Sequence, residues 1–74
     1  MASFTVTVMR NGKRIESARV RIWGSGFFDG YLDERTNDQG QANFNTGMGS
    51  GKVYVNGTLA NTNCRFKGEL TVHL

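Results

Sequence analysis

Apolar and polar residues alternate with a period of two along much of this chain. In residues 4–9 (FTVTVM), threonines separate Phe4, Val6 and Val8, and in residues 18–23 (ARVRIW) apolar residues alternate with two arginines and end on a tryptophan. This spacing is typical of β-strands that bury one face and expose the other. A helix would need apolar residues at i, i+3, i+4 and i+7, and no stretch of ten residues has them.

Turn signals separate the alternating runs. Asn11-Gly12 is the strongest short hairpin signal. Residues 37–40 (NDQG) combine side chains that can bond local backbone with a glycine that tolerates positive φ, so residues 35–46 predict a hairpin that carries Phe44 into the core. The expected strands lie at residues 4–9, 18–23, 31–36, 42–45, 53–59 and 64–74, with further turns at residues 24–30, 47–51 and 61–63.

Short strands joined by glycine-rich turns predict an all-β fold, built as a sandwich or a small barrel of about six to seven strands. The length of 74 residues indicates one domain, residues 1–74. In the last run, from Cys64 to Leu74, the even positions share one face. The expected core is Phe4, Val6, Val8, Val20, Ile22, Phe44, Val53, Val55, Leu70 and Val72.

A chain this short builds a thin core. Below about 70–80 residues, a domain often needs disulfides, a metal or a partner chain. The single cysteine cannot form an internal disulfide, and no Cys and His cluster offers a zinc site. We therefore expect tight packing or association with another chain. If the strand at residues 64–74 is a sheet edge, it can pair with a copy of itself or with a partner sheet.

The order of these features is similar to a known pattern. It reads TVTVMRNGKRIESARVRIW, then RTNDQGQANF with its Thr, Asp-x-Gly turn and Ala-x-Phe, then GKVYVNG. Over about residues 4–57 the chain resembles carboxypeptidase regulatory-like and transthyretin-like domains, which resemble bacterial Ig-like modules. The resemblance implies an Ig-like or transthyretin-like Greek-key sandwich of seven strands that serves as a spacer, stabiliser or interaction module without catalysis. This chain is short for that pattern.

The sequence contains few groups for catalysis. His73, the only histidine, lies near the C-terminus with no identifiable nucleophile or orienting partner. Cys64 lies two residues from Phe66, on the same face of the expected strand, and is expected to be a buried thiol. The glycine-rich segments 24–30 and 47–51 do not match a phosphate-binding loop followed by a helix. We expect no catalytic residue, no cofactor and no enzyme activity.

Four carboxylates gather in residues 29–38 (DGYLDERTND). They are Asp29, Asp33, Glu34 and Asp38. Calcium prefers such oxygen ligands, but the spacing matches no EF-hand loop. Turn formation and solubility explain these residues more simply, and we predict no metal site.

A basic stripe with an aromatic end is the strongest binding signal. Arg19, Arg21 and Trp23 share one face of their expected strand, and the net charge is +3. Phe27 or Phe28, with Tyr31, can extend this surface as exposed aromatics. The stripe can meet an acidic protein, because Trp and Arg are enriched in binding hot spots, or phosphates with the indole stacked on a base. The alternative is a solvated face with Trp23 packed into the core.

These observations predict a non-catalytic protein–protein interaction module, acting in assembly, as an adaptor or as a small inhibitor. The alternative is a small nucleic-acid-binding β-barrel that uses the same strand face. No apolar run approaches the ~20 residues that cross a bilayer. No signal peptide is visible, which favours the cytoplasm, although the chain can equally be a piece of a longer secreted protein.

Overall fold

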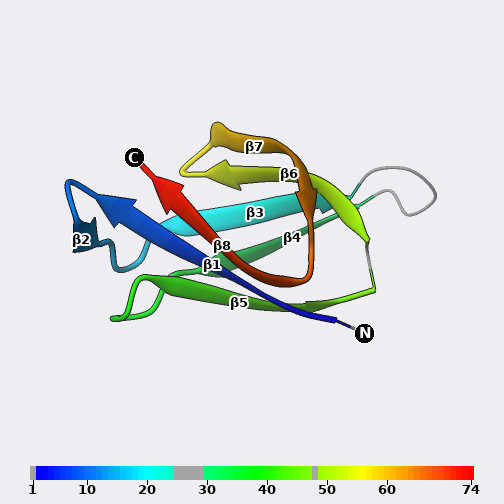
Figure 1. Cartoon of the computed structure of the whole chain (residues 1–74), viewed down its shortest axis with the longest axis horizontal. Coiled ribbons are helices and arrows are strands. Elements are labelled where there is room, and N and C mark those ends of the chain that lie inside the picture. Colours follow the sequence, from blue (N-terminus) through cyan, green and yellow to red (C-terminus); the bar gives the residue numbers. More distant parts are fainter. Residues whose placement is uncertain (1, 25–29, 48) are drawn as a thin grey trace.

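The predicted all-β class is confirmed. A computed structural model describes residues 2–24, 30–47 and 49–74, and within these residues the chain forms two β-sheets packed face to face and no helix (Figure 1). The described residues therefore hold no helix that could span a membrane. The strands are β1 (Ala2–Arg10), β2 (Lys13–Arg14), β3 (Arg19–Gly24), β4 (Gly30–Arg35), β5 (Gln41–Thr46), β6 (Ser50–Val55), β7 (Thr58–Arg65) and β8 (Gly68–His73).

The strands are divided between the sheets out of sequence order. In sheet A, β1 lies between β5, to which it is antiparallel, and β8, to which it is parallel, while the short β2 pairs with the far end of β1. Sheet B has the order β4-β3-β6-β7, with every neighbouring pair antiparallel. The first and last strands are therefore neighbours, although they lie at opposite ends of the sequence.

The core lies between the two sheets and follows the period-two pattern. Every predicted core residue is buried except Leu70, which is half-buried and packs against the others; Ala18, Ala42, Cys64 and Phe66 complete the core. Three phenylalanines meet at its centre, with the ring centroid of Phe4 6.3 Å from that of Phe44 and 5.5 Å from that of Phe66. Leu74 follows the end of β8 and is exposed, as is Gly68, whereas Cys64, Phe66 and Val72 of the same run are buried.

The segment 35–46 forms the predicted turn, but the predicted hairpin is wrong. The Asn37 side chain accepts hydrogen bonds from the amides of Gln39 and Gln41 at 2.9 and 3.1 Å, as the turn signal suggests. However, β4 belongs to sheet B and β5 to sheet A, so the turn is a crossover between sheets. Thr36 stabilises this crossover, since its buried hydroxyl donates to the Ile15 carbonyl and accepts from the Ala18 amide, at 2.6 and 2.8 Å.

The strands predicted at residues 53–59 and 64–74 have different boundaries in the structure. A second Asn-Gly turn ends β6 at Val55, with Asn56 at φ 52° and Gly57 at φ 82°, both left-handed like Asn11 and Gly12. The turn predicted at residues 61–63 lies inside β7, whose pairing with β6 continues through register shifts. The run 64–74 is divided between β7 in sheet B and β8 in sheet A, and Gly68 at φ 78° begins β8.

Candidate functional site

The outward side chains of sheet B form the candidate site, which we call the sheet B outer face. The register places Trp23 on β3 opposite Tyr31 on β4, and Arg21 between Asp33 on β4 and Tyr54 on β6. Directly opposed side chains on one face of a sheet are near neighbours. Residues from three strands that are distant in sequence therefore meet on one surface.

Trp23 and Tyr31 form an exposed aromatic pair. The rings stack with their centroids 5.4 Å apart and their planes inclined by 18°. The exposed fraction is 44% for Trp23 and 52% for Tyr31. The alternative that Trp23 is a core residue is therefore wrong, because its position on the strand alternates with the buried Ile22 and points it outward.

Arg21 is fixed in place by two contacts. Its Nε and Nη2 donate to the two carboxylate oxygens of Asp33, at 2.7 and 2.9 Å, and its Cζ lies 4.3 Å from the ring centroid of Tyr31. The hydrogen bond from Arg21 lowers the pKa of the Asp33 carboxyl, and the same bond raises the pKa of Arg21. Arg21 therefore orients the aromatic pair, and its charge is already balanced.

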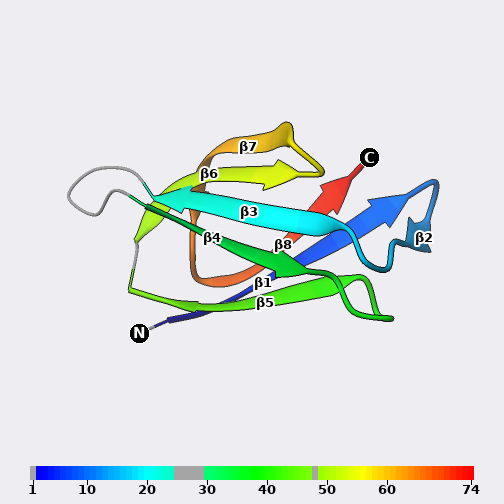
Figure 2. The same cartoon turned by 180° about the vertical axis from the view of Figure 1, so that it is seen from behind.

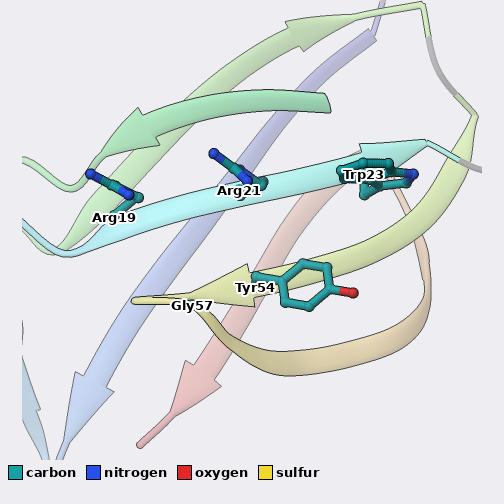
Figure 3. Close-up of a pocket in the computed structure, with 5 residues that line it drawn as sticks. All are labelled: Arg19, Arg21, Trp23, Tyr54 and Gly57. Carbon is teal, nitrogen blue, oxygen red and sulfur yellow. The ribbon is translucent and has the colours of Figure 1, made fainter. Parts of the chain in front are cut away.

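A shallow hollow lies beside this cluster, over β3 and β6. It has a volume of about 250 Å³ and is lined by Arg19, Arg21, Trp23, Tyr54 and Gly57 (Figure 3). Arg19 is anchored through its backbone, since its amide donates to the Asn56 side chain at 3.0 Å and its carbonyl accepts from the Asn56 amide at 2.8 Å. Gly57 adds no side chain that would fill the hollow.

The electrostatic character of this face is basic. Arg35 lies opposite Arg19 in the register and Lys52 lies opposite Trp23, so both add positive charge to the surface. Within the described residues, the only ion pair on this face joins Arg21 to Asp33. The Arg19 guanidinium and the Lys52 ammonium are thus free to meet an anionic ligand. Arg35 has no ion partner either, although its Nη1 donates to the Ser17 carbonyl at 3.4 Å.

The structure brings together four of the six predicted site residues: Arg19, Arg21, Trp23 and Tyr31. Phe27 and Phe28 lie outside the described residues. Tyr54 was missed by sequence reasoning, although its place between the buried Val53 and Val55 marks it as outward. Leu59 was also missed; it lies opposite Tyr54 on β7 and extends the apolar part of the surface.

The other candidates from the sequence do not gather into a second site. Cys64 is buried, and burial raises the pKa of its thiol above the ordinary value of 9.0, which makes it a weak nucleophile. His73 is exposed on β8. Of the four carboxylates, Asp29 lies outside the described residues and Asp33 is bonded to Arg21, and no metal-binding cluster of His, Cys, Asp and Glu occurs in the part of the chain that is described.

Comparison with known protein families, curated proteins and solved structures finds no match to this chain. The geometry of the sheet B outer face is therefore the main indication of function in the described residues.

Proposed function

We propose that this domain is a non-catalytic protein-interaction module that binds an acidic partner protein through the sheet B outer face. The observation that carries the proposal is the band of exposed Tyr31, Trp23 and Leu59 with the half-buried Tyr54, which crosses all four strands of the sheet. Apolar surface of this kind usually marks an interaction site, and Trp and Tyr are common hot-spot residues.

The charges beside this band specify the kind of partner. Arg19, Arg35 and Lys52 flank the band without an ion partner in the described residues. Carboxylates on the partner would meet them, and electrostatic complementarity of this type raises the association rate and excludes basic partners. The hollow beside Trp23 fits one such carboxylate or a small apolar side chain.

The face is also preorganised. The bidentate bond from Arg21 to Asp33 and the stack of Tyr31 on Trp23 hold long side chains in place before binding. Side chains that are already ordered lose less entropy on binding, which favours affinity.

We further propose that the domain belongs to the transthyretin-like sandwich type. Four of the residues that carry the resemblance have structural roles, which supports this assignment. Thr36 stabilises the crossover between the sheets through its two hydrogen bonds. Gly40 has φ 71°, and Ala42 and Phe44 enter the core. Any β-carbon at residue 40 would lie 2.9 Å from the Arg14 side chain, so that position favours glycine.

A single-stranded nucleic acid is the second candidate. The three unpaired cations beside exposed aromatic rings favour it, because strand-binding proteins combine these two features. The stack of Trp23 on Tyr31 disfavours it, since each ring already uses one face that a base would need. For this reason we place the acidic protein first.

The test compares variants of the two sheets against the physiological partner, once this has been identified by crosslinking from Trp23 and Tyr54 positions. Trp23→Ala should weaken binding by at least about 2 kcal/mol, or about thirtyfold, while the melting temperature holds. Thr7→Ala, on the outward side of sheet A, is the matched control and should bind like the parent.

Salt separates the two candidates. With a protein partner, added salt should mainly slow association. With an oligo(dT) probe, affinity should fall steeply as salt rises if the face binds nucleic acid. A Trp23→Ala variant, or an Arg19→Ala and Lys52→Ala double variant, that folds and binds as tightly as the parent would contradict the proposal.

A further inference from the structure

At one side of the sandwich, sheet A ends one strand earlier than sheet B, so sheet B extends beyond it. The two sheets share the side where the chain passes from β4 to β5, and these strands lie close together. From there, sheet B continues through β3, β6 and β7, whereas sheet A continues only through β1 and β8. In both views β7 lies at the margin of the molecule (Figures 1 and 2), and within the described residues it pairs only with β6.

The free edge of β8 presents unpaired backbone groups at this side. The Leu74 amide donates to the Met9 carbonyl at 2.7 Å, so it points toward β1. Because successive residues of a strand direct their backbone groups to opposite edges, those of Glu69, Thr71 and His73 point away from β1. No strand among the described residues pairs with them.

Leucine side chains border the same opening. A groove of about 350 Å³ runs between residues 58–61 of β7 and residues 70–74 of β8. Leu74 is 41% exposed and Leu70 is half-buried, whereas Leu59 lines the groove from β7 but shares the outward face of Tyr54. A groove of mixed polar and apolar lining beside free backbone groups offers what strand addition requires, because main-chain hydrogen bonds give affinity and pockets for alternate side chains give specificity.

On the opposite side of the sandwich, the edge strand of sheet B is protected. On β4, Glu34 pairs in register with the buried Val20, which places its carboxylate on the core-facing side of an edge strand. An inward charge of this kind opposes the addition of another strand. The core-facing positions of β8 instead carry Leu70 and Val72, so this edge lacks that protection.

We propose that this opening takes one extended segment of a partner protein, which adds to sheet A as a strand beside β8. Sheet B extends one strand, β7, beyond β8, so the space beside β8 accommodates a single added strand. The edge of a second sandwich approaching β8 would bring its own overhanging β7 against this one, which disfavours pairing of two copies.

The groove also specifies the sequence of the segment. Apolar side chains at alternate positions would face Leu70 and Val72, because neighbouring strands align their side chains by face. On the other face, the Glu69 carboxylate has no ion pair in the described part of the chain. A Lys or Arg beside it would supply the complementary charge.

Hydrogen exchange with synthetic peptides tests the proposal. The probes are seven-residue peptides that alternate Val, Ile or Phe with Thr and carry one Lys at a Thr position. At saturation, the amides of Thr71 and His73 should gain about tenfold or more protection, whereas their protection should be independent of protein concentration without peptide. Peptides N-methylated on the amides that face β8 should not bind.

Variants of β8 supply the controls. Thr71→Pro removes an outward amide without removing a bond to β1, and should weaken peptide binding about tenfold or more, while Thr71→Ala should bind like the parent. If Thr71→Pro does not fold, Glu69→Lys serves instead, and should prefer peptides with Glu in place of Lys. Trp23→Ala should leave peptide binding unchanged, because it lies on the sheet B outer face.

Three outcomes would overturn the proposal. The first is that no peptide of the panel protects Thr71 and His73 at millimolar concentration. The second is that Thr71→Pro or Glu69→Lys binds every peptide as the parent does. The third is protection of these amides that rises with protein concentration in the absence of peptide, which would assign the edge to a second copy of the chain.

Discussion

The outward faces of the two sheets cover the same core with different chemistry. On sheet A, short polar side chains dominate, and the Thr5 hydroxyl donates to the Asn43 side chain at 2.8 Å across β1 and β5. On the sheet B outer face, Trp23, Tyr31 and Tyr54 lie among arginines. Alternation decides which residues turn inward in both sheets. Only the residues that turn outward distinguish the polar face of sheet A from the aromatic and basic face of sheet B.

Phe4→Ala should cause the largest loss of unfolding free energy, because Phe4 packs in the core between the two sheets. Phe4 contacts Phe44 and Phe66, and the loss of a buried phenylalanine costs about 3–5 kcal/mol. That is most of the stability of a domain of this size. Trp23 is the only tryptophan, so its fluorescence in urea reports the unfolding of sheet B.

Thr5→Ala is the control for this substitution, since it changes the outward residue next to Phe4. It should cost below about 1 kcal/mol. A Phe4→Ala variant that loses sheet A but retains a cooperative transition at Trp23 would show that the two sheets fold independently.

Gly51→Ala should disturb the sheet B outer face alone. A β-carbon at this buried position would lie 1.9 Å from the Trp23 carbonyl oxygen, so the backbone of β3 or β6 must move. We expect a loss of about 2–3 kcal/mol in unfolding free energy and a changed Trp23 emission.

Gly49→Ala is the matched control, because a β-carbon there meets no atom within 4 Å. It should change stability by about 0.5 kcal/mol or less. Equal losses from both variants would mean that the close approach of β6 to Trp23 is unimportant.

Asp33→Asn should have the smallest effect and tests what orients the aromatic pair. The hydrogen bond from Arg21 lowers the pKa of Asp33 from its ordinary value of 3.8. The ion pair therefore contributes stability above that value, and the contribution is lost as pH falls below it through the folded-state pKa. Trp23 emission in the parent should change in this acid range, and Asp33→Asn should lack that change. If Trp23 emission changes with pH in the same way in both proteins, Asp33 does not orient the aromatic pair.

Much of the fold can be predicted from this sequence because burial follows local alternation. Phe4, Val20 and Val53 each lie between two outward-facing residues, so their burial can be predicted from the sequence. Alternation does not predict which strands belong to which sheet. The turn at residues 37–40 has the same local chemistry whether its strands pair or separate, and the buried hydroxyl of Thr36 stabilises the separated arrangement.

The common face of the candidate site could be predicted only along β3, although Tyr31 was also expected to be an exposed aromatic. Arg19, Arg21 and Trp23 are two residues apart, so their common face follows from β geometry. Tyr54 joins them through the pairing of β3 with β6, which links residues more than thirty positions apart. Asn56-Gly57 has the same hairpin signal as Asn11-Gly12 and would have revealed the end of β6, although not the strand that β6 pairs with.

The parallel pairing of β1 with β8 has a consequence for the order of folding. During synthesis, β1 emerges before β8, so one side of β1 remains without its neighbour until residues 68–73 have been made. Contacts of such large sequence separation slow the search for the native state, and all-β domains of this kind fold in milliseconds to seconds. Until β8 docks, the apolar residues of β1 are available to the wrong neighbour, and misfolding competes with completion of the sandwich.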